Sequence, residues 1–153
     1  MNITYCFKWW LKKKRPIDIL DNNHAREKHL KGEYYTAVIS ENDKVNYVVS
    51  IDQNYVVVKF MNDSTAPYLT YEFHRVKDDS VFLKFASFCQ YDGEQEIEEM
   101  NFNFEQDGTV YMEKINLVSG EVDAREGKED VSCNWDKFPK FAEYGNLLRL
   151  ERE

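Results

Sequence analysis

Cysteine and histidine, which supply many metal and catalytic sites, are scarce in this chain of 153 residues, with three of each. Cys6, Cys89 and Cys133 are odd in number and far apart in the sequence. Their spacing therefore supports neither a disulfide scaffold nor a zinc site. Long apolar runs are missing as well, and nothing approaches the eighteen or so residues that a membrane-spanning helix needs. We therefore expect no stable membrane insertion.

A secretory signal is not recognisable at the start of the chain. The apolar part is short, is interrupted by Lys8, and precedes the basic run 12–15 instead of following it. Together with unpaired thiols, this pattern predicts a cytoplasmic protein.

Motifs that carry chemistry are also missing. The sequence has no Gly-x-Ser-x-Gly elbow, no glycine-rich phosphate loop and no His-Glu-x-x-His. His24 and His29 are five residues apart and would diverge by roughly 140° on a helix, and His74 alternates with polar residues on a predicted strand. Cys133 lies in Ser-Cys-Asn-Trp, a context that does not indicate an activated thiolate. We therefore predict no catalytic residue, no metal ligand and no cofactor, and expect the protein not to be an enzyme.

Charge is distributed unevenly along the chain, whose net charge is −8. Residues 1–32 contain eight Lys and Arg against three acids, a balance of +5, so the remainder carries −13. Such an acidic body repels phosphate backbones and attracts cationic partners. Nucleic-acid binding is therefore not expected. The plainer alternative is that the acidity only maintains solubility.

The first 32 residues are predicted to form a basic, partly helical segment. Trp9 and Trp10 beside the basic run 12–15 could lie on an anionic membrane, or could cover an open end of a β core. The small apolar content favours the second interpretation. Residues 21–31 have the end signals of a short helix, with an Asx residue at the start and Gly32 after the end.

From residue 33 onward the sequence is typical of antiparallel β structure, with period-two alternation and acidic or glycine-containing turns. A short strand is also possible within 131–135. The strands predicted with clear alternation are 33–40, 44–51, 54–61, 68–76, 81–91, 95–105, 109–118 and 121–126.

These patterns predict one mainly β domain over residues 1–153, with an acidic antiparallel body over 33–153. The body would be a single sheet, a barrel or a sandwich of about eight strands, preceded by the short helix. An eight-stranded barrel like the lipocalins or fatty-acid-binding proteins would suit a small-ligand carrier, which needs an apolar cavity.

The apolar residues of the predicted strand 95–105 change parity between Ile97 and Met100. One extra residue at Glu98–Glu99 would restore a single buried face, so a β-bulge is predicted there. Alternate residues such as Glu96, Asn101 and Asn103 would then face solvent.

Acidic residues cluster on this predicted hairpin. Alternate carboxylates along a strand lie about 6.7 Å apart, close to the phosphate spacing of nucleic acid. Such a row could occupy a groove built for phosphates or steer a basic partner, although it could also be a solvated face that deters aggregation. The candidate partner-binding residues are Tyr91, Asp92, Glu94, Glu96, Glu98, Glu99, Glu105 and Asp107.

Several stretches resemble a known family. They are 68–76 with 81–84, 107–114, and 129–135 with the Phe-Pro-x-Phe-x-x-Tyr continuation at 138–144. Together they resemble the small proteins encoded beside Rhs-type polymorphic toxins of enterobacteria, which act as cognate immunity proteins. The similarity spans residues 33–150, and the first 32 residues do not contribute to it.

The resemblance implies an inhibitor that acts inside the bacterial cytoplasm. Its partner would be the C-terminal domain of a secreted toxin, a nuclease or an ADP-ribosyltransferase. Tight binding would cover the toxin's active site or substrate surface. The resemblance assigns this role but no contact residues.

Overall fold

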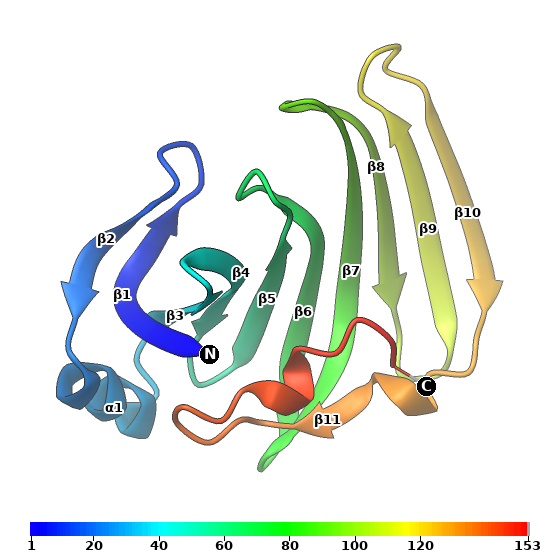
Figure 1. Ribbon diagram of the computed structural model, residues 1–153. Helices are drawn as coiled ribbons and strands as arrows, with labels where there is room; N and C mark the ends of the chain where they lie inside the picture. The colour runs from blue at the N-terminus through cyan, green and yellow to red at the C-terminus, as the bar shows by residue number, and fades with distance from the viewer. Residues whose placement is uncertain (153) are drawn as a thin grey trace.

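In the computed structural model, which describes residues 1–152, the chain forms one open, curved antiparallel sheet with a single short helix (Figure 1). Ten strands lie in the order β10-β9-β8-β7-β6-β5-β4-β3-β1-β2, and the eleventh, β11, pairs with the start of β7. The strands are β1 (Asn2–Trp10), β2 (Arg15–Leu20), β3 (Tyr35–Glu41), β4 (Lys44–Ile51), β5 (Tyr55–Met61), β6 (Pro67–Lys77), β7 (Ser80–Asp92), β8 (Gln95–Phe104), β9 (Thr109–Asn116), β10 (Val122–Lys128) and β11 (Trp135–Lys137).

The mainly β prediction with a short N-terminal helix is confirmed. The eight strands predicted from residue 33 onward correspond to β3–β10, with ends that agree to within two residues. The closed barrel and the two-layer sandwich are wrong, because β10 and β2 are the two unjoined edges of one sheet. The count of about eight strands is also too low, since β1, β2 and β11 extend the sheet.

The N-terminal segment is partly helical, as predicted, but its residues 2–20 form a β-hairpin that was not predicted. Strands β1 and β2 pair antiparallel, with Trp9 opposite Pro16 and Tyr5 opposite Leu20. Pro16 has no backbone N–H, and it is tolerated because β2 is an edge strand, whose outer side forms no hydrogen bonds to another strand. Trp9 is buried, whereas Phe7, Trp10 and Leu11 are exposed, so only one of these side chains helps to cover a core.

Helix α1 (Asn22–Lys31) follows the hairpin at the predicted position. The Asp21 carboxylate accepts a hydrogen bond from the His24 backbone N–H at 2.8 Å, and Gly32 ends the helix at φ +71°. Within residues 1–152, no helix has the length and apolar character needed to cross a bilayer.

One face of the sheet carries the main hydrophobic core, and we call it the covered face. Residues that pair from strand to strand form a buried row across β3–β7, made of Tyr35, Ile51, Val56, Phe73 and Leu83. Helix α1 and the C-terminal segment 131–152 supply the other side of this core, including Ala25, Tyr144 and Leu147. In Figure 1 the C-terminal segment crosses the lower part of the sheet.

A charged cluster fastens the C-terminal segment over the core. The Asp136 carboxylate accepts hydrogen bonds from Arg152 at 2.5 Å, Arg149 at 3.1 Å and Asn146 at 2.7 Å. Burial by itself would raise the pKa of Asp136, but the hydrogen bonds from Asn146 and Arg152 reverse that effect and the pKa is lowered. The guanidinium of Arg152 also lies 5.0 Å from the centre of the Phe73 ring.

Candidate functional site

Strands β8, β9 and β10 extend the sheet beyond most of the C-terminal segment, and we call them the free strands. In Figure 1 they stand at the right of the molecule, and every residue of β10 is exposed. Antiparallel sheets commonly bury one face and expose the other. Here large parts of both faces are open, so each face is a candidate interaction surface.

The outer face, opposite the covered face, combines aromatic, amide and acidic side chains on β7 and the free strands. Directly paired residues share a face, so the strand register defines three rows across these four strands. The rows are Phe85, Asn103, Tyr111 and Glu126; Ser87, Asn101, Glu113 and Ala124; and Cys89, Glu99, Ile115 and Val122.

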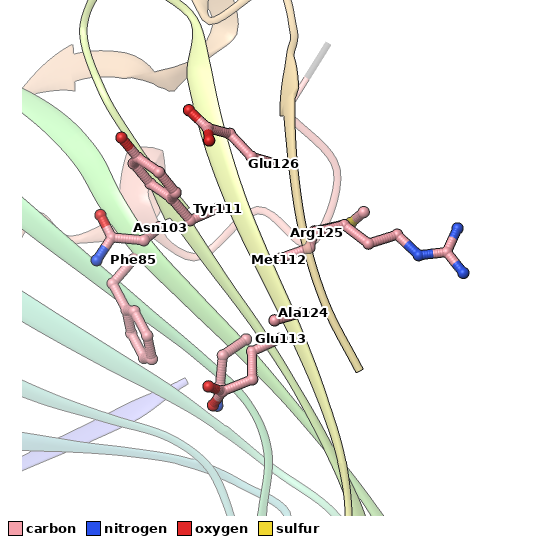
Figure 2. Close-up of a pocket in the computed structure, with 9 residues that line it drawn as sticks. Phe85, Asn103, Tyr111, Met112, Glu113, Ala124, Arg125 and Glu126 are labelled. Atoms are coloured by element: carbon pink, nitrogen blue, oxygen red, sulfur yellow. The ribbon is translucent and has the colours of Figure 1, made fainter. Parts of the chain in front are cut away.

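The first two rows, apart from Ser87, line a shallow hollow of about 490 Å³. Figure 2 shows Tyr111 and Glu126 pointing to one side of the strands and the Arg125 side chain to the other. Tyr111 is 47% exposed although it is a large aromatic residue. Exposed aromatic side chains beside polar groups are typical of protein-binding surfaces.

The carboxylates of the outer face are not neutralised by neighbouring cations. Among residues 1–152, no ion pair involves the acids that the free strands place on this face, which are Glu96, Glu99, Glu113 and Glu126. On the opposite face of the same strands, Glu98 lies 3.8 Å from Lys114, and Asp123 lies 3.3 Å from Arg125. The negative potential of the free strands is therefore concentrated on the outer face.

The remaining polar groups of this face are neutral or unsatisfied. The pKa of the Cys89 thiol is raised to about 12. Burial is the main cause, and a hydrogen bond with Glu96 and the negative charge of that residue add to it. Burial also raises the pKa of Tyr91 to about 12, and its hydroxyl donates to the Pro67 carbonyl at 2.6 Å. The Oδ1 atom of Asn101 is buried and accepts no hydrogen bond from the described residues.

The opposite face of β7 and the free strands carries an apolar strip, defined as Phe88 of β7 with Met100, Phe102 and Met112 of the free strands. Phe88 pairs with Met100 and Phe102 with Met112 across neighbouring strands. The rings of Phe88 and Phe102 are 6.0 Å apart and nearly perpendicular, at 82°. Phe88 is 44% exposed and Met112 is 38% exposed. A contiguous exposed apolar surface of this kind marks an interaction site more often than a scattered apolar residue does.

The structure brings together three of the eight predicted partner-binding residues. Tyr91, Glu96 and Glu99 share the outer face, whereas Glu98 lies on the opposite face. The cause is a bulge in β8: Gln90 pairs with Glu98 but Tyr91 pairs with Glu96, so Ile97 is the extra residue. The bulge was predicted one residue later.

The other predicted residues lie at the two ends of the hairpin. Asp92 and Glu94 are at the β7–β8 turn, whereas Glu105 and Asp107 are at the β8–β9 turn, at the opposite end of β8. There Glu105 accepts a hydrogen bond from Lys84 at 2.6 Å, and Asp107 accepts one from the Thr109 backbone N–H at 2.9 Å. The eight residues therefore do not form one continuous row.

Sequence reasoning missed the part of the outer face that β9 and β10 supply. Tyr111 and Glu113 alternate on β9 directly after the Asp107–Gly108 turn, and the hairpin register places them opposite Asn103 and Asn101. The Asp107–Gly108 turn was predicted from the sequence. Following the strand pairing outward from this turn would have placed Tyr111 and Glu113 beside the two asparagines. Glu126 on β10 gives no comparable signal, because its strand lacks apolar alternation.

The residues considered for catalysis lie apart from one another. His74 Nε2 is 2.9 Å from Glu72 on an exposed part of β6, and Cys133 lies in the C-terminal segment. His29 Nδ1 is 2.8 Å from the Tyr35 hydroxyl, which is 3.0 Å from the Tyr144 hydroxyl, and burial lowers the pKa of His29. The part of the chain that the structure describes contains no cluster of three or more His, Cys, Asp or Glu arranged to hold a metal.

Compared with known proteins, the sequence matches no family model, no curated protein and no solved structure at a significant level.

Proposed function

We propose that this protein is an immunity protein that binds the C-terminal domain of a cognate toxin in the cytoplasm and blocks its active site or substrate surface. The single observation that supports this most is the outer face of β7–β10, where four carboxylates form no ion pair within residues 1–152 and two of them, Glu113 and Glu126, neighbour the exposed ring of Tyr111. The sequence resemblance to immunity proteins of Rhs-type toxins points in the same direction.

The chemistry of the outer face favours a basic partner. A nuclease or an ADP-ribosyltransferase holds phosphates in a positively charged groove, and carboxylates on neighbouring strands can take the place of those phosphates. Charge of this kind mainly raises the association rate and the specificity. A nanomolar complex needs about 12 kcal/mol. Aromatic anchors such as Tyr111 and Phe85 would supply much of this energy.

The shape of the free strands suits occlusion. They form a single layer with an unpaired edge at β10, an acidic outer face and the apolar strip behind it. A groove that receives this layer would contact both faces, so the charge would guide entry and the strip would contribute apolar burial. The closed barrel on which the small-ligand carrier alternative depended is not present, because the sheet is open.

Co-expression with a toxin domain encoded immediately upstream tests the role. The pair should co-purify and growth should be restored, and a toxin that kills equally well in the presence of this protein would refute the proposal.

Charge reversal tests the surface. Replacing Glu99, Glu113 and Glu126 with lysine should slow association at least about tenfold at low salt and much less at high salt, since screening removes long-range attraction. The measurement is the association rate constant by stopped-flow or surface plasmon resonance.

A matched control changes the same amount of charge elsewhere. Glu27, Glu41 and Glu143 are exposed, lie away from the free strands and form no ion pair within residues 1–152. Their replacement with lysine should slow association only slightly. An equal effect of both triple variants would mean that net charge matters and the outer face does not.

The role of Tyr111 as an aromatic anchor can be tested separately. Because Tyr111 is exposed, Tyr111→Ala should leave the fold intact and raise the dissociation rate by about tenfold or more. An unchanged dissociation rate would exclude the hollow from the interface.

A further inference from the structure

The N-terminal hairpin bends across the outer face of the sheet at the end far from the free strands. Trp9 belongs to a small buried cluster with Val48 of β4 and Met61 of β5. At the hairpin turn, Lys14 Nζ donates to the Ser64 carbonyl at 2.5 Å, in the connection between β5 and β6. The hairpin is thus held over β3–β5 and is not a free arm.

Below the hairpin lies a cleft of about 320 Å³, within the range of small-ligand sites. Its lining comes from the hairpin, from Tyr34 just before β3 and from the outer face of β4 and β5. The residues are Lys8, Trp9, Leu11, Tyr34, Val48, Ser50, Tyr55, Val57 and Lys59.

The cleft is basic in a protein whose net charge is −8. Two lysines line it, and no Asp or Glu within the described chain belongs to the lining. Hydroxyl groups of Tyr34, Ser50 and Tyr55 add further hydrogen-bonding capacity, whereas Trp9, Val48 and Val57 form apolar surface. This combination fits a ligand that has one anionic group and an apolar body.

Lys59 is the residue that most needs such a ligand. Burial lowers its pKa, and in residues 1–152 its ammonium group makes no hydrogen bond or ion pair. The nearby Glu72 favours the charged lysine, but its carboxylate is engaged by His74 at 2.9 Å. A half-buried, unpaired ammonium is unfavourable, and a bound anion would compensate it.

The charged groups of the cleft wall are donors. Both are lysine ammonium groups, which only donate hydrogen bonds. An acceptor-rich ligand is therefore a better match for this cleft than a donor-rich one.

We propose that the cleft between the N-terminal hairpin and strands β4 and β5 binds a small organic anion, a carboxylate, sulfonate or phosphate carried on an aromatic or aliphatic body. The anionic group contacts Lys59 and Lys8, and the body packs on Trp9 and Val57. This site is separate from the acidic outer face of the free strands.

Binding of 8-anilinonaphthalene-1-sulfonate to the purified chain tests the proposal. This probe combines a sulfonate with an aromatic body, and Trp9 in the cleft allows energy transfer from indole to dye. Saturable binding of one dye per chain is expected. The uncharged analogue N-phenyl-1-naphthylamine should bind at least about tenfold more weakly, because it lacks the charge-assisted hydrogen bonds.

Two variants locate the dye. Lys59→Met keeps the length of the side chain and should weaken dye binding about tenfold or more, and Lys8→Met, at an exposed position that cannot disturb the core, should weaken it several-fold. Lys12→Met changes an exposed lysine outside the cleft lining and should change the affinity less than twofold.

Three results would overturn the proposal. These are unchanged affinity in both the Lys59 and Lys8 variants, equal affinity for the charged and uncharged dyes, or dye binding that disappears only when Phe88 and Met112 are replaced with serine. The last result would place the dye on the apolar strip. None of these measurements needs a protein partner, so they can fail while the immunity function stands.

Discussion

Replacing Asp136 with alanine should destabilise the protein by about 3–5 kcal/mol, because it leaves a buried cation without its partner. The side chains of Asp136 and Arg152 are 10% and 5% exposed, so water can replace little of the lost interaction. The substitution also removes the acceptor of the hydrogen bonds from Asn146 and Arg149. For a chain of this length the loss corresponds to a fall of roughly 6–20 °C in Tm.

Asp136→Asn separates charge from hydrogen bonding. It retains an acceptor for the Asn146 amide and for the Lys137 backbone N–H but removes the negative charge opposite Arg152. The expected loss is about 2–3 kcal/mol, smaller than for alanine. Because the pKa of Asp136 is lowered in the folded state, its contribution is present above the ordinary value of 3.8 and is lost as the pH falls through the folded pKa.

Urea unfolding followed by tryptophan fluorescence is the assay, since Trp135 is adjacent to the substituted residue. Asp123→Ala is the control, because Asp123 and Arg125 pair at 3.3 Å on an exposed strand and their loss should cost at most about 0.5 kcal/mol. If Asp136→Ala and Asp123→Ala cost the same, the charged cluster does not hold the C-terminal segment on the core.

Two further predictions concern His29 and Gly108. Burial lowers the pKa of His29 in the folded protein below its ordinary value of 6.5. As the pH falls, the imidazole is therefore protonated in the unfolded chain before it is protonated in the folded protein. The free energy of unfolding should fall as the pH drops below about 6.5, until the pH passes the folded pKa. His29→Gln should remove this component from urea midpoints measured between pH 7 and pH 5, and an unchanged profile would contradict it. Gly108→Ala should cost about 2–3 kcal/mol, since φ is +96° and the new Cβ would lie 2.7 Å from the Glu129 carbonyl oxygen. Gly120→Ala, at φ +80° in open space, should cost only about 1 kcal/mol. Equal losses of stability in the two variants would show that the backbone shifts to relieve the contact with Glu129.

The body of the sheet was predictable because its strands follow a local rule. Side chains alternate between the two faces, and Asx or glycine residues mark the turns, so β3–β10 could be placed to within two residues. The bulge was found from the change of parity between Ile97 and Met100. The N-terminal hairpin was missed because its apolar residues were considered as one run beside the lysines. Ile3, Tyr5, Phe7 and Trp9 in fact alternate.

The open shape was not predictable, because closure depends on strand tilt and stagger, which no local pattern specifies. Only part of the outer face was predicted, because its acids lie on several strands and no local pattern relates one strand to another. Glu96 and Glu99 could be assigned to one face from β8 alone, but their companions Glu113 and Glu126 lie on other strands. Grouping acids by distance along the sequence instead placed Glu105 and Asp107 with them, although these belong to a turn at the far end of the hairpin.

The order in which the chain is synthesised has a consequence for how the core becomes protected. Strands β3–β10 pair with their neighbours in sequence, so they can join one after another as they leave the ribosome. The segment that covers their apolar face, with Tyr144 and Leu147, is translated only afterwards. A released chain truncated near residue 130 should therefore form most of the sheet but leave its apolar face exposed, and chaperones bind such surfaces.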